Sequence, residues 1–251
     1  MEAVAIIIIL LFVFIVFVLS LQNSSESEDG SHNDYSWFAN HIHKNEQITS
    51  VTSLERGTWS ERDLIYELRE YGIPAGAIFH DLYINKFGDK YTQIDLVVAT
   101  KVGLIVFEVK DYKGWIFGRG NQDKWTQVLS YGDRKYRFYN PIKQNASHIS
   151  ELRKQSKQLS KIPIFSVVVF YGDCSLRDIS IIPHNTYVTT ARRVLDVVDA
   201  IIDENPPANY TDKREIVRVL KNAVDNGKKE EIVTKHAEQV QDMLGEDRVF
   251  D

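Results

Sequence analysis

A mainly apolar stretch of the sequence, YTQIDLVVATKVGLIVFEVK at residues 91–110, carries polar side chains at four positions that could do chemistry. They are Gln93, Asp95, Glu108 and Lys110. Carboxylates from two neighbouring strands suit Mg²⁺, which takes oxygen ligands and is often held by only one or two carboxylates. A lysine beside them can orient a water molecule or stabilise negative charge developing on a phosphate. The pattern therefore suggests metal-dependent chemistry on a phosphate ester.

The spacing of these residues predicts that they meet on one surface of a sheet. Residues 91–99 and 103–110 have the composition of buried strands. Because side chains alternate across a strand, the polar residues of each strand share a face. If the two strands pair antiparallel through the turn between them, opposite residues lie about 5 Å apart. Two carboxylates brought together in this way would repel each other unless a cation lay between them.

A purely structural interpretation competes with this one. A half-exposed strand can alternate apolar and charged residues, and a lone Glu108–Lys110 pair is more commonly a surface ion pair than a catalytic one. The spacing Asp-x12-Glu-x-Lys, taken alone, does not decide between the two interpretations.

The order of the expected elements indicates an α/β domain with a mixed sheet and helices packed on it. A helix is expected within residues 54–72, because apolar residues recur there at helical spacing before Gly72 and Pro74. The expected strands are 76–84, 91–99, 103–110, 114–118, 124–129, 135–139 and 165–171, and the further expected helices are 142–160, 189–204, 211–225 and 228–245.

The N-terminal part of the chain predicts a membrane anchor. Residues 3–21, AVAIIIILLFVFIVFVLSL, form an apolar run, and an apolar helix of about 20 residues spans roughly 30 Å of hydrocarbon. A cleaved signal peptide fits less well, because no basic region precedes the run and no small-x-small site follows it. Residues 22–52 are expected to form a polar linker. Few basic residues flank the span to orient it, so a single-pass protein with a cytoplasmic domain is expected on functional grounds alone.

The distribution of charge is compatible with a polyanionic partner. The whole chain has a net charge of −5, but residues 110–161 contain twelve Lys or Arg and four Asp or Glu, a net charge of +8. Local fields rather than the total charge govern the approach of a polyanion. The acidic total therefore does not exclude nucleic acid.

Several short motifs in this order resemble a known family. They are G-T-W-S-E at 57–61, Q-I-D at 93–95, G-L-I-V-F-E-V-K at 103–110, D-Y-K-G-W-I at 111–116, Trp125 and N-P-I-K-Q at 140–144. Together they cover about residues 53–171. The chain resembles the nuclease-related domain family, NERD, of the PD-(D/E)xK superfamily.

The resemblance implies a restriction-endonuclease-like core and hydrolysis of nucleic-acid phosphodiesters with Mg²⁺ or Mn²⁺, DNA being favoured over RNA. Asp95 and Glu108 would be metal ligands, together with the main-chain carbonyl of Val109. Lys110 would position the water or stabilise the transition state. Glu61 would bind a second metal or polarise a water, and Gln93 would hold Asp95 or the nucleophile in place.

Basic and polar residues after the expected metal site are candidates for binding nucleic acid. They are Lys113, Arg119, Lys124, Lys143, Gln144 and Arg153. Aromatic residues interleave with the basic ones between residues 115 and 139, a combination that holds single strands or distorted duplexes. The competing interpretation is that these aromatic residues pack a small antiparallel insertion against the sheet.

The sequence therefore predicts a nuclease-related domain at residues 53–190 and a C-terminal helical appendage at 191–251 that serves either packing or the binding of a protein partner. The alternative function is a catalytically weak or inactive module that binds nucleic acid or protein at the membrane.

Overall fold

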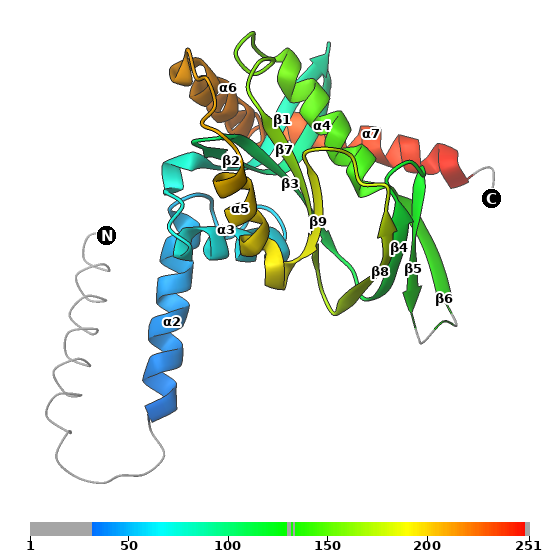
Figure 1. Cartoon of the computed structure of the whole chain (residues 1–251), viewed down its shortest axis with the longest axis horizontal. Coiled ribbons are helices and arrows are strands. Elements are labelled where there is room, and N and C mark those ends of the chain that lie inside the picture. Colours follow the sequence, from blue (N-terminus) through cyan, green and yellow to red (C-terminus); the bar gives the residue numbers. More distant parts are fainter. Residues whose placement is uncertain (1–31, 130–131, 133, 249–251) are drawn as a thin grey trace, which may run out of the picture. The chain divides into compact units, whose positions relative to one another are not determined.

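The computed structural model describes residues 32–129, 132 and 134–248 (Figure 1). The chain divides into two compact units, Met1–Ile42 and His43–Asp251, and both sheets lie in the second unit. The predicted membrane anchor at residues 3–21 falls outside the described residues. Within the described part of the chain, no helix combines the length and the apolar composition that crossing a membrane requires.

The first sheet contains the two strands on which the predicted chemistry depends. Its strand order is β1-β2-β3-β7-β9. The strands are β1 (Ile78–Phe87), β2 (Lys90–Thr100), β3 (Gly103–Asp111), β7 (Ile164–Tyr171) and β9 (Thr186–Thr190). The first three pair antiparallel, whereas β3, β7 and β9 pair parallel, so the sheet is mixed, as predicted.

A second sheet follows directly from β3 along the chain. Its strand order is β6-β5-β4-β8. The strands are β4 (Gly114–Arg119), β5 (Lys124–Leu129), β6 (Arg134–Tyr139) and β8 (Cys174–Ser180). The neighbours β4, β5 and β6 pair antiparallel, and β8 joins β4 in parallel. Figure 1 shows these strands grouped together beside the first sheet.

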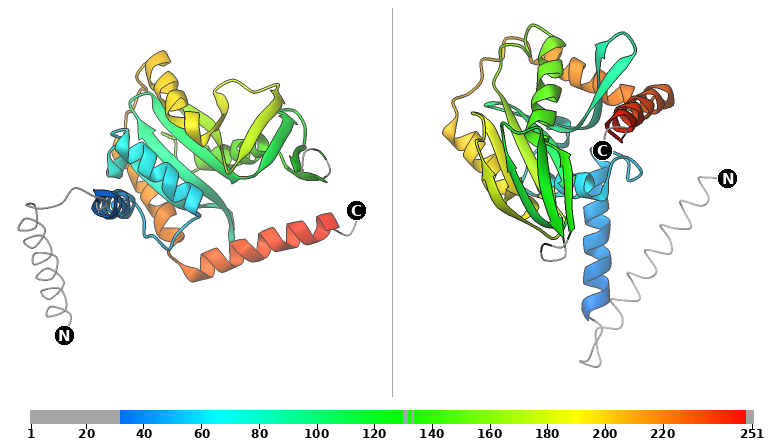
Figure 2. Two further views of the ribbon diagram at one scale, coloured as in Figure 1. Left: turned by 90° about the horizontal axis from the view of Figure 1, so that it is seen from below. Right: turned by 90° about the vertical axis from the view of Figure 1, so that its right-hand side faces the viewer.

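Helices cover both faces of the first sheet (Figure 2). Helices α3 (Trp59–Glu70) and α5 (Val194–Glu204) supply apolar side chains to the core on one face, and α4 (Pro141–Lys154) and α6 (Lys213–Asn226) supply them on the other. The remaining elements are α2 (His32–Thr49), α7 (Glu230–Arg248) and the short 3-10 helices η1 (Ala75–Ala77) and η3 (Ala191–Arg193).

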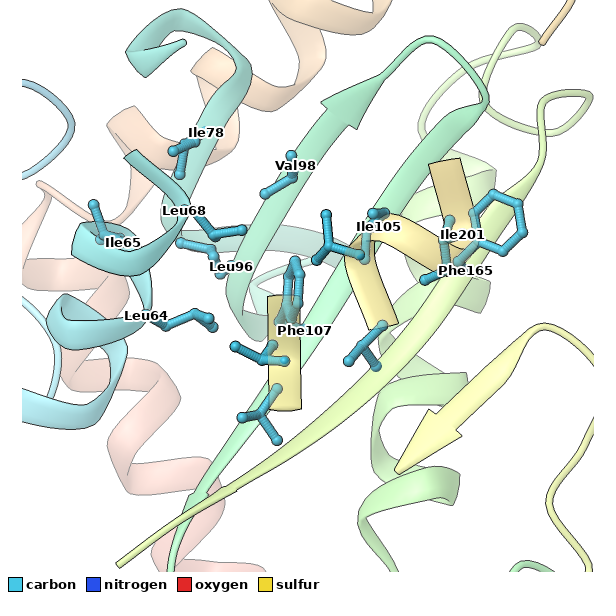
Figure 3. Close-up of a cluster of buried hydrophobic side chains, with 14 of the residues drawn as sticks. Leu64, Ile65, Leu68, Ile78, Leu96, Val98, Ile105, Phe107, Phe165 and Ile201 are labelled. Atoms are coloured by element: carbon cyan, nitrogen blue, oxygen red, sulfur yellow. The ribbon is translucent and has the colours of Figure 1, made fainter. Parts of the chain in front are cut away.

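Local sequence explains where α3 begins and which side of it is buried. Thr58 is its N-cap, and the Thr58 side chain accepts a hydrogen bond from the backbone N–H of Glu61, which is half of a Thr-x-x-Glu capping box. Leu64, Ile65 and Leu68 recur at helical spacing and are completely buried. They pack against residues such as Phe107 of β3 in the cluster of Figure 3, which fixes the helix beside the predicted catalytic strand.

The helices after residue 190 share these cores. Val198 and Ile201 of α5 belong to the same apolar cluster as α3, and Ile216 and Leu220 of α6 pack on the opposite face. Elements on both sides of residue 190 thus contribute to the same apolar clusters, and the domain division at that residue stays a prediction. Because α6 buries one face against β1, that face is occupied within this chain.

The structure contains three elements that the sequence pattern did not predict. Helix α2 occupies much of the predicted polar linker, and strands β8 and β9 follow β7. Helix α2 lacks a continuous apolar stripe, and its C-terminal half is held to α3 by polar contacts such as Lys44–Asp63. Strands β8 and β9 are short, lie at sheet edges and are only partly buried, so their sequences lack the apolar signal of a central strand.

Candidate active site

Strands β2 and β3 separate at Asp95. Strands β2 and β3 are paired from Thr100↔Gly103 to Leu96↔Phe107, and no pair follows. On the other edge of β2, pairing with β1 omits the position where Asp95 faces Asp81. Asp81 has a left-handed backbone with φ of 56°, a conformation that aspartate tolerates better than most residues. Asp95 therefore lies where the regular ladder is interrupted on both sides.

The carboxylate of Asp95 replaces the backbone acceptor that β2 would otherwise offer to Val109 of β3. The backbone N–H of Val109 donates to Asp95 Oδ2 over 2.8 Å. In a strand, the N–H and C=O of one residue point toward the same edge, so the Val109 carbonyl also faces the β2 edge. The other edge of β3 stays paired with β7 as far as Asp111↔Tyr171. The strand that carries Glu108 and Lys110 is therefore held firmly although its β2 edge is open.

Glu108 is almost completely buried and contacts two basic side chains. Its exposed fraction is 1%. Lys110 Nζ lies 2.6 Å from Glu108 Oε1, and His148 Nε2 of α4 lies 3.4 Å from Glu108 Oε2. Burial acts to raise the pKa of Glu108, but the hydrogen bond from His148 and the charge of Lys110 outweigh it, so the pKa lies below its ordinary value. Glu108 is thus held as a carboxylate.

Asp95 experiences the opposite electrostatic environment. Burial raises its pKa well above the ordinary value, and the negative charges of Glu108 and Glu61 raise it further. The hydrogen bond from Val109 and the charge of Lys110 act to lower the pKa but do not compensate. Glu61, Asp95, Glu108 and Lys110 are therefore close enough to interact, and the three carboxylates outnumber the one ammonium group among them.

Lys110 is held in its charged form. Burial acts to lower the pKa of Lys110, but the charge of Glu108 and the hydrogen bond to it outweigh this effect, and Asp95 contributes in the same direction. The pKa is therefore raised, and the ammonium group is protonated at neutral pH.

Glu61 lies at the start of α3 and is buried, with 6% of it exposed. Its Oε1 accepts from the Thr58 hydroxyl over 2.9 Å, and its Oε2 accepts from His80 Nε2 of β1 over 3.0 Å. His80 Nδ1 in turn lies 3.0 Å from Thr52 Oγ1. Burial acts to raise the pKa of Glu61, but the hydrogen bonds from His80 and Thr58 lower it overall. Glu61 thus caps the helix and keeps a carboxylate within electrostatic range of Asp95.

Gln93 belongs to a second polar network beside the site. Its Nε2 donates to Asp81 Oδ1 over 2.8 Å. Asp81 Oδ2 also accepts from Arg56 Nη2 over 2.7 Å and from Arg56 Nε over 3.0 Å. Gln93 therefore contacts Asp81, the residue whose left-handed backbone faces Asp95, and the structure shows no hydrogen bond between the described side chains of Gln93 and Asp95.

Sequence comparison agrees with this geometry. Residues 56–171, which include Glu61, Asp95, Glu108 and Lys110, match the family described as NERD, nuclease-related domain. The chain contains a nuclease-related domain. An uncharacterized protein of Bacillus anthracis is 33% identical over 105 residues, which cover 41% of this chain and 47% of that protein. The chain thus spans about half the length of this curated relative. No solved structure matches the chain.

The donor atoms of the NERD domain suit a hard divalent cation. Among the described residues, no group of three or more His, Cys, Asp or Glu side chains is arranged to hold a metal ion. Mg²⁺, however, is often bound through one or two carboxylates, with water completing its shell. Asp95, Glu108 and the Val109 carbonyl are oxygen donors of this kind, and a cation would relieve the repulsion that raises the pKa of Asp95. Coordination by Glu108 would require its contact with Lys110 or His148 to lengthen.

Three of the residues predicted to bind nucleic acid are exposed around the second sheet of the NERD domain. Lys113 lies between β3 and β4, Arg119 ends β4, and Lys124 begins β5. Lys143 lies on α4, with its Nζ 2.5 Å from Asp123 Oδ1. The positions leave the side chains of Lys113 and Arg119 near solvent, where phosphate could reach them.

The other two predicted contact residues, both on α4, take part in local structure. The backbone N–H of Gln144 donates to the Asn140 carbonyl in the first turn of α4, and its side chain is partly exposed. Arg153 Nη1 donates to the carbonyls of Leu159 and Ile162 over 3.3 and 3.1 Å. The guanidinium of Arg153 therefore closes the segment between α4 and β7, and nucleic-acid contact by these two residues stays a prediction.

Sequence reasoning missed two histidines of the site. His80 and His148 look isolated in the sequence, yet they contact Glu61 and Glu108 respectively. His148 Nδ1 also lies 2.7 Å from Thr92 Oγ1, so it connects α4 to both β2 and β3. One signal was available: His148 follows Gln144 of the N-P-I-K-Q motif by four residues, which places both on one side of a helix.

Proposed function

We propose that the NERD domain hydrolyses phosphodiester bonds of nucleic acid with Mg²⁺ or Mn²⁺ bound by Asp95, Glu108 and the Val109 carbonyl. The single observation that supports this most strongly is the separation of β2 from β3 at Asp95, beside a buried carboxylate and a charged lysine. A restriction-endonuclease-like core and a preference for DNA over RNA belong to this proposal and rest on the resemblance to the family.

The chain's own residues can be given distinct roles. The bound cation would supply a Lewis acid that polarises the phosphate and lowers the pKa of a coordinated water. Because Lys110 is protonated at neutral pH, it stabilises negative charge on the phosphate rather than removing a proton from water. Glu61 keeps a carboxylate near Asp95, and Gln93 supports the strand distortion at Asp81.

The cellular setting of this activity is part of the proposal. Residues 3–21 would anchor the chain as a single-pass membrane protein, with the NERD domain in the cytoplasm. The apolar length of this segment is sufficient for a membrane span. The helices α5 to α7 would carry any protein partner on surfaces that the core does not use.

A catalytically weak binding module is a second candidate, and one observation favours it. Both carboxylate oxygens of Glu108 contact a basic side chain, Lys110 or His148. If these contacts persist when a cation is offered, the domain would hold nucleic acid without cutting it. Binding that does not depend on metal would characterise this alternative.

The experiment that tests the nuclease proposal combines cleavage with metal binding. The full chain, Asp95→Ala and a control variant at an exposed aspartate, Asp203→Ala, are assayed on labelled single-stranded and double-stranded DNA and RNA with Mn²⁺. We expect the parent and the control to cut and to give heat on Mn²⁺ titration, and Asp95→Ala to do neither. Equal cleavage by Asp95→Ala and the parent would contradict the site. Binding of Mn²⁺ without cleavage would favour the binding module.

A further inference from the structure

The second sheet has two faces of different character. On the inner face, Trp125 is completely buried and stacks on Phe170 of β7, with ring centroids 6.1 Å apart and an interplanar angle of 6°. Phe138 of β6 packs edge-on against Trp125, and Ile142 of α4 completes this cluster. Trp125 and Phe138 therefore build a core, as the structural interpretation of the sequence expected, and are not available for stacking on a ligand.

The strand register places a second set of aromatic and basic residues on the outer face. Because side chains alternate along each strand, the neighbours of Trp125 and Phe138 in sequence point away from the core. The register forms rows across β4, β5 and β6. One row is Trp115, Val128 and Lys135, and the next is Phe117, Thr126 and Arg137. Lys124 of β5 pairs with Tyr139 of β6. The outer face therefore includes Trp115, Phe117, Arg119, Lys124, Thr126, Val128, Lys135, Arg137 and Tyr139. From β8 it includes Ser175 and Asp178, which pair with Trp115 and Phe117, and Arg177, whose guanidinium lies 5.2 Å from the Trp115 ring.

Exposure and charge on the outer face suit one class of ligand. Tyr139 is 53% exposed. Lys135, Arg137 and Arg177 are exposed, and the Trp115 and Phe117 rings are partly exposed between them. Among the described residues of this face, Asp178 of β8 is the acidic one, set against five Lys or Arg. Aromatic rings between basic side chains match the alternation of bases and phosphates in a single strand, where bases are free to stack.

We propose that the outer face of β6-β5-β4-β8 binds single-stranded nucleic acid, with bases on Trp115, Phe117 and Tyr139 and phosphates on Lys135, Arg137 and Arg177. As a substrate-delivery surface it rests on the proposed nuclease function, and it narrows the substrate to a strand that is unpaired where it is held. Trp115 follows Lys110 by only five positions in the chain, a path of at most about 18 Å. A strand held on the outer face therefore has a short way to the candidate site.

Binding is measured with the full chain in a non-ionic detergent, by fluorescence anisotropy of a labelled oligothymidylate of roughly 20 nucleotides, longer than the site of a typical single-strand module. EDTA is present throughout, so cleavage cannot occur. Tyr139→Ala removes a stacking ring and should weaken binding at least about fivefold. Arg137→Ala should reduce the slope of log affinity against log salt by about 0.7, the value of one single-strand phosphate contact. Lys101→Ala, an exposed lysine in the β2–β3 turn, serves as the matched control and should leave both quantities unchanged.

The outcomes separate this proposal from the nuclease proposal. Parent-like affinity in both Tyr139→Ala and Arg137→Ala, or tighter binding of the same sequence as a duplex, would overturn the single-strand surface. Lack of any nucleic-acid binding by the parent would also overturn it. If Asp95→Ala binds the oligonucleotide like the parent and no variant cuts, the surface stands and the nuclease proposal fails. If Asp95→Ala alone stops cleavage while the surface variants bind and cut normally, the nuclease proposal stands and the single-strand surface fails.

Discussion

The backbone N–H of Val109 donates to Asp95 Oδ2 over 2.8 Å, at the point where β2 ceases to pair with β3. One side chain thus replaces a backbone partner in the sheet and carries a carboxylate into a region that is already negative. The first role stabilises the fold and the second opposes it, because burial and, after it, the charges of Glu108 and Glu61 raise the pKa of Asp95. A substitution that separates the two roles can therefore distinguish structure from function.

Asp95→Asn should raise the stability of the metal-free protein while abolishing metal-dependent cleavage. Asparagine keeps an oxygen that can accept from Val109 but removes the charge. The folded-state pKa of Asp95 lies above the ordinary value of 3.8. Asp95 therefore lowers the free energy of unfolding progressively as pH rises from the ordinary pKa to the folded-state pKa. The gain should be largest at neutral pH and smaller in acid. Thermal unfolding in EDTA measures it, each kcal/mol corresponding to about 2–4 °C in Tm. A lower Tm at neutral pH would contradict this explanation.

Glu108→Gln should have the opposite effect on stability. It leaves the Lys110 ammonium largely buried without its carboxylate, at a cost of about 3 kcal/mol. The folded-state pKa of Glu108 lies below the ordinary value of 4.5. The contribution of Glu108 to the free energy of unfolding is therefore fully present above pH 4.5 and is lost as pH falls through the folded-state pKa. Urea unfolding at neutral and acidic pH should show the difference between parent and variant shrinking only in acid.

Glu151→Gln provides the matched control for this comparison. Glu151 pairs with Lys154 over 2.8 Å on α4, where the lysine side chain is 62% exposed and the glutamate side chain 15% exposed. A pair of this kind contributes at most about 0.5 kcal/mol. Equal destabilisation by Glu108→Gln and Glu151→Gln would show that the buried pair has no special role.

The fold followed from the sequence wherever a strand or helix is buried on at least one side. Strands β2 and β3 match the predicted 91–99 and 103–110 within two residues, because their apolar runs are central to the sheet. Helix α2 and strands β8 and β9 were not predicted, since polar contacts and edge positions, rather than apolar periodicity, hold them. Residue spacing could suggest that Asp95 and Glu108 converge, because strand alternation and a short turn constrain both.

The surroundings of those carboxylates could not be deduced in the same way. His80 reaches Glu61 and His148 reaches Glu108 across 19 and 40 residues of sequence, and tertiary packing of α3 and α4 on the sheet sets these contacts. The interruption at Asp81 is likewise invisible in the sequence, because aspartate adopts a left-handed backbone in many settings. Local patterns thus indicated the candidate ligands, whereas the groups that contact them could be found only from the fold.

His148→Ala should weaken metal binding without unfolding the domain. The change removes the contacts of His148 with Glu108 and Thr92, so the Glu108 carboxylate is no longer oriented from α4. Groups that orient metal ligands typically contribute about 10–100-fold in metal affinity. Calorimetric titration with Mn²⁺ should show a loss in this range, and His184→Ala, an exposed histidine, should show none. Unchanged Mn²⁺ affinity in His148→Ala would assign this histidine to packing alone.

Gly57→Ala should disrupt the support of Glu61 more severely than an equivalent change elsewhere. Gly57 has φ of +68°, and a Cβ there would overlap His80 Nε2 and Glu61 Oε2. Gly88, in the turn between β1 and β2, has φ of +58°, and a Cβ added there would meet no atom within 4 Å. Both substitutions bear the strain of a left-handed backbone, about 1–2 kcal/mol.

Only Gly57→Ala must also push apart the Glu61–His80 hydrogen bond. It should therefore lower Tm further than Gly88→Ala and reduce cleavage, whereas Gly88→Ala should cut like the parent. Equal Tm values with undiminished cleavage in both variants would show that Glu61 needs neither His80 nor its present position.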